Sequence, residues 1–366
     1  MSDTQASTSR AFESEDKDND EIGLRELITT LWQGKIYIAF CIFFTTSMAI
    51  SYALLANEKW VTKSSISKPQ LSDYLKYQIQ VSQYQPAFDI YQEDGTVLVS
   101  EALVKLLDPE ELLLRFVQQF KSTRNKKSYI NQQEDFQNEL RSLTDLKNKE
   151  RQKRPLLGLY AKWYSKLSIN VQKKTLLEYS LTSYTNFPEA SYNLLIGYVD
   201  YINNKSRDIA LRNLHSIVLA KKVELVKQRK IFESHAKVKL DIELQLSRSA
   251  LKIASSAGVD KPVENLGDKE LFAIDLGANA LKAKVGILSE IKNFSTMEPR
   301  IQIINSKLNI LEGIDLSKNI EFDLFQFIEQ PEIPISRSSP KRFLIAILGS
   351  VLGGIIVLVR TFFGKN

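Results

Sequence analysis

The chain has 366 residues and a formal net charge of +6, with 43% hydrophobic and 25% charged residues. This length and composition allow one large folded domain or two modest ones. The single cysteine, Cys41, excludes an intrachain disulfide, and with only two histidines, His215 and His235, the chain lacks a zinc ligand set of the usual kind. We therefore expect neither a metal nor a cofactor.

The leader, residues 1–35, begins with a polar stretch that is rich in Ser and Asp and lacks periodicity, which is typical of a disordered tail. From Ile22 onward the apolar residues recur three and four positions apart. This spacing predicts a short amphipathic helix whose apolar positions are Leu24, Leu27, Ile28 and Leu31. We expect this helix to lie against the face of a membrane.

Residues 36–56 contain no charged residue, and about 21 residues are enough to cross the hydrocarbon core of a bilayer as a helix. Tyr37 and Trp60 lie where interfacial aromatic residues belong. A signal peptide would begin nearer to the N-terminus and have a shorter apolar core. A buried helix of a soluble domain would normally show a polar face. We therefore interpret residues 36–56 as the first transmembrane helix.

The segment that follows begins with a predicted strand over residues 60–67, which Pro69 closes. Residues 70–106 show several helical patches without a clear pattern. Pro109 is well placed at the start of a helix that runs to Phe120. The charged stretch 121–154 is predicted to be helical with solvated faces.

Residues 166–172 and 175–183 alternate with period two and predict a hairpin, with Lys173 and Lys174 near its turn. Residues 186–189 are then expected to open a helix, with Pro188 near its first turn, because proline is favoured there.

Residues 205–257 contain neither proline nor glycine and space their apolar residues three and four apart, with charges between. This pattern predicts one continuous helix of about 50 residues, about 75 Å long. Such a helix needs a partner along its length, from the same chain or from a neighbouring subunit. Two or three shorter helices with an unrecognised break are the alternative.

After this helix, residues 271–293 are predicted to be helical. Residues 322–330 alternate as a strand, with Phe322, Leu324, Gln326 and Ile328 on one face and Phe325 and Phe327 on or near the other. Pro331, Pro334 and Pro340 are expected to hold the chain extended as it enters a second apolar stretch.

That second stretch, residues 343–359, is about 17 residues long, at the short end for a spanning helix. Arg342 and Arg360 flank it and can extend it by snorkelling. Gly349 and Gly353 have the small-xxx-small spacing that lets another helix approach closely, and Gly354 follows. Two spanning helices place both termini on the same side of the membrane, but basic residues flank both helices on both sides, so their distribution does not decide which side this is.

The arrangement resembles the polysaccharide co-polymerases, the chain-length determinants of O-antigen and related surface polysaccharides. Three segments carry the resemblance at the chain ends: residues 27–35, residues 57–60, and the proline-rich residues 331–342 before the second span. The glycines at 349, 353 and 354 fit the family's second helix, and residues 271–281 are similar to a family segment after the long helix.

The resemblance implies an α+β membrane protein in the cell inner membrane, with two transmembrane helices, cytoplasmic termini and a periplasmic domain over residues 57–341. It implies a small membrane-proximal α/β base, residues 57–204 and 258–341, and a very long helix, residues 205–257, that extends away from it. Residues 342–366 form the second transmembrane helix and a short tail. The strands near Trp60, Lys166, Thr175 and Phe322 are expected to build the sheet of the base.

The function implied is control of how many repeat units a membrane polymerase adds to a lipid-linked polysaccharide, carried out by a ring-like homo-oligomer. The expected partners are therefore further copies of the chain, the polymerase, the lipid-linked polysaccharide and the bilayer, and no nucleic acid. Most of the charged residues between the two spans are expected to form a solvated mixed surface, and contact of their basic excess with anionic lipid or polysaccharide is the alternative.

Catalysis is not expected. Some relatives carry a tyrosine kinase, but this sequence has neither the phosphate-binding motif G-x-x-x-x-G-K-[ST] nor a G-x-S-x-G motif. A membrane-anchored periplasmic sensor, or a scaffold for another polysaccharide system, is the alternative. The candidate site residues are those of the motif before the second span and the glycines within it: Pro331, Pro334, Arg337, Ser339, Pro340, Lys341, Gly349, Gly353 and Gly354. Their expected role is to fix the entry of the chain into the membrane and to pack the helices.

Overall fold

The computed structural model describes residues 32, 35–92, 94–144, 149–263, 272–314 and 320–363. The chain divides into two compact units. The terminal unit comprises residues 1–60 and 335–366, and the central unit comprises residues 61–334. The amphipathic helix predicted in the leader lies outside the described residues.

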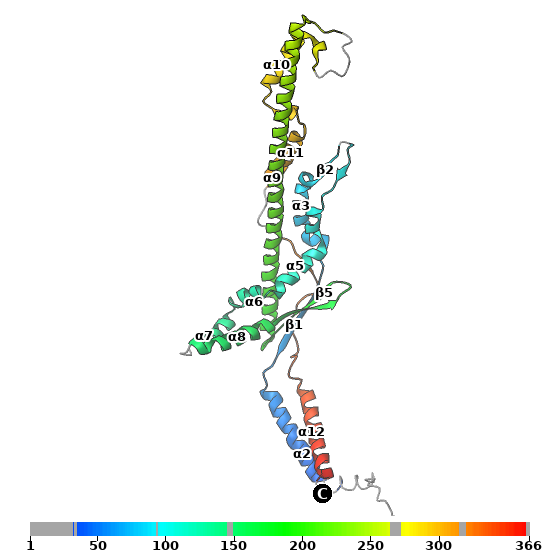
Figure 1. Cartoon of the computed structure of the whole chain (residues 1–366). Helices are drawn as coiled ribbons and strands as arrows, with labels where there is room; N and C mark the ends of the chain where they lie inside the picture. Colours follow the sequence, from blue (N-terminus) through cyan, green and yellow to red (C-terminus); the bar gives the residue numbers. More distant parts are fainter. Residues whose placement is uncertain are drawn as a thin grey trace, which may run out of the picture. The chain divides into compact units, whose positions relative to one another are not determined.

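The terminal unit contains two apolar helices, α2 (Lys35–Leu55) and α12 (Arg342–Phe363), which pack along each other (Figure 1). Helix α2 is long and apolar enough to cross a membrane. In α12 the apolar part that the structure describes is shorter, Arg342–Val357. Two membrane-spanning helices therefore remain a prediction.

The central unit is built on a four-stranded sheet with strand order β4-β5-β1-β6. Its strands are β1 (Trp60–Ser67), β4 (Leu167–Lys173), β5 (Glu178–Thr185) and β6 (Gln326–Glu329). The β4–β5 hairpin pairs Ile169 with Leu181, and β1 pairs antiparallel with β6. The four strands predicted to form the sheet of the base are thus the strands that form it.

The last strand is shorter than its alternating sequence predicts. Only residues 326–329 pair, because the chain bends at residues 324 and 325. The rings of Phe322 and Tyr77 stack at 4.4 Å, and Phe325 lies 4.4 Å from Phe116, so Phe322 and Phe325 both enter the core. The predicted separation of these residues onto opposite faces is wrong, since a bend removes the alternation that a strand imposes.

Between β1 and β4 the chain is mostly helical. Its helices are α3 (Leu71–Phe88), α4 (Glu101–Val104), the 3₁₀ turn η1 (Lys105–Leu107), α5 (Pro109–Lys121), α6 (Thr123–Ile130), α7 (Glu134–Thr144) and α8 (Lys149–Ser165). Helix α5 begins at Pro109 as predicted, and the Asp108 carboxylate accepts a hydrogen bond from the Glu110 amide at 3.0 Å. A small hairpin of β2 (Ile90–Tyr91) and β3 (Val97–Leu98) was not predicted.

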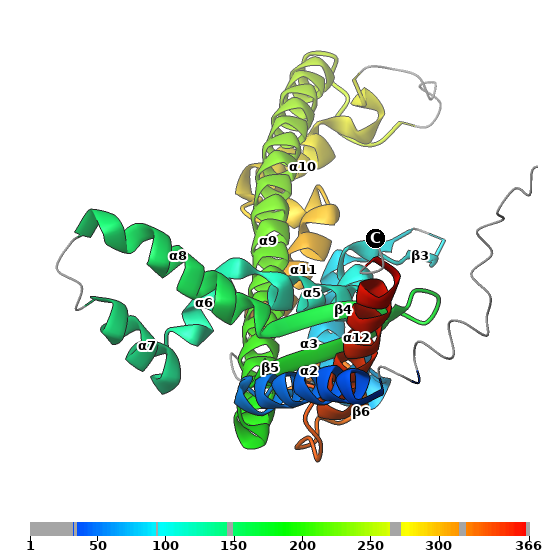
Figure 2. The ribbon, with the colours of Figure 1, turned by 90° about the horizontal axis from the view of Figure 1, so that it is seen from below.

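Helices α6, α7 and α8 occupy the charged stretch that was predicted to be helical with solvated faces. Figure 2 shows α7 and α8 side by side, reaching away from α9. Both carry an apolar inner side: Phe136 of α7 is fully buried, and its ring packs edge-on against that of Trp163 of α8 with the ring centres 5.5 Å apart. The helical part of the prediction is confirmed, while the solvation holds for the outer faces only.

The longest element is α9 (Pro188–Ser256), a single helix of 69 residues. At 1.5 Å per residue it is about 100 Å long. The helix predicted to open at residues 186–189 and the long helix predicted from Lys205 are one continuous helix, so the alternative of several shorter helices is wrong. The helix packs on β5, α3, α5 and α6 near its start and on α11 (Arg300–Gly313) and α10 (Gly277–Glu290) further along (Figure 1).

The core of the central unit is rich in aromatic residues. Tyr198 of α9 packs edge-on against Phe120 at 4.7 Å, and its hydroxyl donates a hydrogen bond to the Phe120 carbonyl at 2.9 Å. A separate small cluster joins Ala250 and Ala254 of α9 to Leu281 of α10. The same chain therefore supplies partners for both ends of the long helix, which a single amphipathic helix of this length requires.

Candidate functional site

The motif before α12 meets the segment after α2 through one carboxylate. The Glu58 Oε1 atom accepts hydrogen bonds from Arg337 Nη1 at 2.6 Å and from Arg342 Nη2 at 3.0 Å. All three side chains are about one-third exposed. Because both donors are charged, these are among the stronger hydrogen bonds a protein makes, although partial exposure weakens them.

Backbone hydrogen bonds close the same contact. The Lys59 amide donates to the Ser339 carbonyl at 2.8 Å, and the Ser338 amide donates to the Lys59 carbonyl at 2.9 Å. Two segments about 280 positions apart thereby lie side by side at the ends of α2 and α12. We call this set, Glu58, Lys59, Arg337, Ser338, Ser339 and Arg342, the terminal clamp.

The other predicted motif residues have different places. Pro340 is buried next to the terminal clamp, and Lys341 is exposed while its carbonyl accepts the Ile345 amide at 3.1 Å in the first turn of α12. Pro331 is buried and Pro334 half-buried, and both belong to the central unit. The structure thus brings Arg337 and Ser339 together with residues 58 and 59, but the two earlier prolines are not members of this contact.

Two of the three predicted glycines lie against α2. A Cβ atom on Gly349 would lie 2.6 Å from the Ala49 Cβ, and one on Gly353 would lie 2.8 Å from the Ile42 Cα. A Cβ atom on Gly354 would meet no heavy atom within 4 Å. The close helix approach that the small-xxx-small spacing allows is therefore used within the chain, and Gly354 is outside it.

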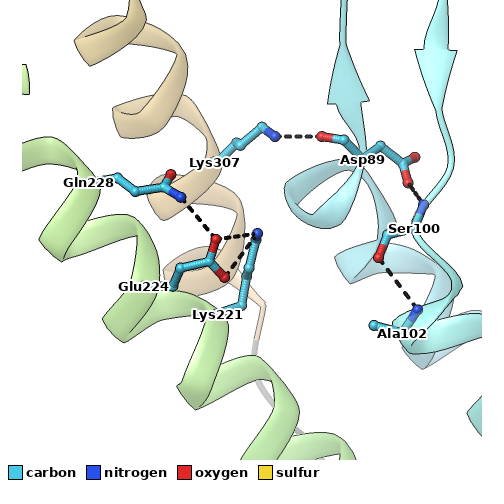
Figure 3. A network of polar contacts seen from close by, with 7 residues as sticks. All are labelled: Asp89, Ser100, Ala102, Lys221, Glu224, Gln228 and Lys307. Atoms are coloured by element: carbon cyan, nitrogen blue, oxygen red, sulfur yellow. Dashed lines mark hydrogen bonds and ion pairs between the residues drawn. The ribbon is translucent and has the colours of Figure 1, made fainter.

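A second polar cluster, in the central unit, connects α11 to the start of the β2–β3 hairpin (Figure 3). Lys307 Nζ donates to the Asp89 carbonyl at 2.5 Å, and the Asp89 carboxylate accepts the Ser100 amide at 3.0 Å. Beside it on α9, Lys221 Nζ donates to Glu224 Oε1 at 3.0 Å. Burial, together with the nearby Lys221 ammonium, lowers the pKa of Lys307 below its ordinary value.

Sequence reasoning found the segments of the terminal clamp but missed its ion pairs. The available signal was a charge pattern: the acidic Glu58 follows the first span, and the motif before the second span contains Arg337 and Arg342. The cluster around Asp89 gave no sequence signal. Among the described residues, no group of three or more His, Cys, Asp and Glu side chains is placed to hold a metal ion.

Residues 20–110 match the family model described as chain length determinant protein. The chain is 23% identical to the chain length determinant protein of Escherichia coli K12 over 345 residues, covering 93% of this chain and 91% of that protein. A solved full-length bacterial polysaccharide co-polymerase shares the fold, with a TM-score of 0.63, 21% identity, and coverage of 93% of this chain and 98% of that one.

The family resemblance is confirmed. Two further relatives from Escherichia coli K12 have similar extents of match. The ECA polysaccharide chain length modulation protein is 23% identical, covering 94% of each chain. The protein described as ferric enterobactin transport protein FepE is 22% identical, covering 92% of this chain and 87% of that protein. The likeness to the polysaccharide co-polymerases thus extends over nearly the whole chain rather than over the matched N-terminal segment alone.

Proposed function

We propose that this protein regulates the chain length of a surface polysaccharide of the lipopolysaccharide O-antigen class. The observation that carries the proposal is the extent of the likeness: two relatives named for chain length, one of them for that of a polysaccharide, match more than nine-tenths of the chain. The transport function in the name of one other relative stays with that relative, because the matching family model also describes chain length determination.

We infer that the protein acts by contact rather than by catalysis, and without a cofactor. In the two polar clusters described above, the charged groups bind one another or the backbone: two arginines share the Glu58 carboxylate, and Lys307 donates to a backbone carbonyl. Groups paired in this way stabilise a structure and are poorly placed to activate a substrate.

The proposed location is the cell inner membrane, with α2 and α12 both spanning it, the termini in the cytoplasm and the central unit in the periplasm. The apolar surfaces of α2 and α12 support this, because exposed apolar side chains cover most of both helices. The polymerase and the lipid-linked polysaccharide are the proposed partners in that membrane.

The proposed active form is a ring-like homo-oligomer. Helix α9 supports it, because Ile231, Ile242 and Ile253 are between 40% and 54% exposed and recur every eleven residues. An eleven-residue spacing, 3.67 residues per turn, keeps side chains on one line along a helix. This line is separate from the face of α9 that buries Ala250 and Ala254 against α10, and a second copy of the chain is its proposed occupant.

The test is a gel of surface lipopolysaccharide from the host strain with the gene, without it, and with it restored on a plasmid. We expect deletion to change a clustered distribution of chain lengths into a random, short-biased one while polymer is still made, and restoration to reverse the change. An unchanged ladder would refute the proposal for this polysaccharide. The sensor or scaffold alternative would then have to be tested on other surface polymers.

A further inference from the structure

A polar cavity of 610 Å³ lies between α7, the end of α8 and the start of α9 in the central unit. Its volume falls within the range of about 300–1,000 Å³ that small-molecule sites occupy. Its wall includes three asparagines, Asn138, Asn186 and Asn193, and the aromatic residues Trp163 and Phe187. Neither polar cluster described above contributes to it.

One of the two aromatic residues that line this cavity, Phe187, has its backbone fixed by hydrogen bonds. Phe187 is the residue before α9, and its carbonyl accepts hydrogen bonds from the Thr185 hydroxyl at 2.7 Å and from the Ser191 amide at 3.1 Å. Phe187 as a whole residue is nevertheless 68% exposed. An exposed phenylalanine on a fixed backbone offers a flat apolar surface to a ligand without a large cost in ordering.

The amide groups of the wall are available for hydrogen bonding. No other described residue makes a hydrogen bond to the side chain of Asn138, Asn186 or Asn193. Each amide offers an acceptor oxygen and two N–H donors. A ligand covered with hydroxyl groups, each of which both donates and accepts, is satisfied by such a wall, whereas a purely anionic ligand would meet unmatched acceptor oxygens.

Trp163, the buried aromatic residue of the wall, is held in place by contacts with charged side chains. The Trp163 indole N–H donates to Glu139 Oε2 at 3.3 Å, Lys162 Nζ donates to the same oxygen at 3.0 Å, and Lys166 Nζ lies 3.2 Å from the centre of the Trp163 ring. Burial raises the pKa of Glu139, but the hydrogen bonds from Lys162 and Trp163 outweigh it and hold the pKa below its ordinary value. Because Lys166 covers the buried indole, the ring that remains open to a ligand is Phe187.

The charges of the wall favour an uncharged ligand. Glu134, Asp135 and Glu139 line the cavity together with a single ammonium group, that of Lys166. An excess of carboxylates disfavours phosphates and uronic acids by repulsion between like charges. A sugar ring without charge avoids this repulsion, packs its C–H face on Phe187 and presents its hydroxyls to the amides.

We propose that this cavity binds a segment of neutral polysaccharide, with Phe187 as the stacking platform and Asn138, Asn186 and Asn193 as the hydroxyl-binding groups. The inference rests on the proposed function, which supplies a polysaccharide as the partner, and it adds the place of contact and the charge class of the sugar.

The test is isothermal titration calorimetry of the full chain in lipid nanodiscs. The probe is a size-fractionated oligosaccharide released by mild acid from the surface polysaccharide of the host, and a polyuronate oligosaccharide is the acidic comparison. We expect the neutral probe to bind and Phe187→Ala to weaken it about tenfold, equivalent to about 1.4 kcal/mol. The double variant Asn138→Ala with Asn193→Ala should weaken binding further, and the polyuronate should not bind.

Two matched variants control for general effects. Leu157→Ala removes another exposed apolar side chain, 69% exposed on α8, and Asn309→Ala removes an exposed amide on α11. Neither residue lines the cavity, so both should bind the probe within twofold of the unaltered chain. Circular dichroism melting of every variant shows whether a loss of binding reflects a loss of folding.

The outcomes separate this inference from the proposed function. Equal binding of the neutral oligosaccharide by the Phe187→Ala and control variants would overturn the inference. If the unaltered chain does not bind this oligosaccharide, while the chain lengths on the gel still depend on the gene, the inference is overturned and the proposed function stands. A smaller oligomer in Phe187→Ala, with no oligosaccharide binding, would make the cavity a contact between copies instead. If binding depends on Phe187 but deletion of the gene leaves the distribution of chain lengths unchanged, the binding site is supported and the proposed regulatory function is refuted.

Discussion

The contact between α2 and α12 predicts a sharp difference between two neighbouring glycines. In Gly353→Leu the new Cβ would lie 2.8 Å from the Ile42 Cα, whereas non-bonded carbon atoms prefer about 3.5–4.0 Å. The two helices must therefore separate or bend by about 1 Å before the rest of the leucine side chain is accommodated. Overpacking of this kind costs about 1–3 kcal/mol. Gly354→Leu is the matched control, because no heavy atom lies within 4 Å of its Cβ position.

Pulsed electron paramagnetic resonance in lipid nanodiscs measures this separation. Spin labels at Ile36 and Val359 report on the far ends of the antiparallel pair, and both side chains are exposed, so that the labels disturb little. Cys41 is first replaced by Ser to leave no other thiol. We expect Gly353→Leu to lengthen or broaden the distance distribution and Gly354→Leu to leave it unchanged. Identical distributions in the two variants would refute the assignment of Gly353 to the helix contact.

Three further predictions concern single side chains. Glu58→Ala leaves two arginines without their shared carboxylate and should lower the unfolding free energy by about 1 kcal/mol, because partial exposure keeps the effect small. Urea unfolding measures this against Glu332→Ala, a substitution of an exposed glutamate. Equal unfolding midpoints for the two variants would contradict the prediction. Tyr198→Phe removes a buried hydroxyl donor and should cost about 0.5–1.5 kcal/mol in the same assay, so an unchanged midpoint would show that this hydrogen bond adds nothing. Burial lowers the pKa of Lys166 from 10.5 to about 8, so the folded chain releases this proton at lower pH than the unfolded chain. The contribution of Lys166 to the unfolding free energy should accordingly rise with pH between about 8 and 10.5 and be absent in Lys166→Met, and parallel pH curves for the two proteins would exclude it.

The long helix shows which of its features local sequence patterns predict and which depend on tertiary contacts. The lack of Gly and Pro over residues 205–257 predicts continuity, yet the helix begins earlier, at Pro188, and includes Gly197. A Cβ atom at Gly197 would meet the Tyr129 hydroxyl oxygen at less than van der Waals distance. The glycine is therefore explained by a neighbouring side chain 68 positions away, and it does not break the helix, because tertiary packing overrides its weak intrinsic propensity.

The candidate site was predictable in its segments and not in its contacts. Proline and glycine patterns located residues 331–342 and the packing face of α12, since these residues restrict the backbone locally. The pairing of Glu58 with Arg337 spans 279 positions, and local patterns carry no information about such a distance. The cavity beside Phe187 was also missed, because Asn138 and Asn193 become neighbours only when α7 packs near the start of α9.

The order of the strands determines when each strand can pair with its neighbours during synthesis of the chain. Strand β1 is synthesised first, but its neighbours β5 and β6 come much later, and the Ser64 hydroxyl donates to the Glu329 carbonyl 265 positions further on. The hairpin of β4 and β5 forms from adjacent residues, whereas one edge of β1 stays unpaired until almost the entire central unit has been synthesised. A chain that stops before residue 326 would present that edge to other molecules, and an unpaired strand edge is a template for aggregation. Premature termination near the end of the gene should therefore yield an insoluble product rather than a shortened but folded one.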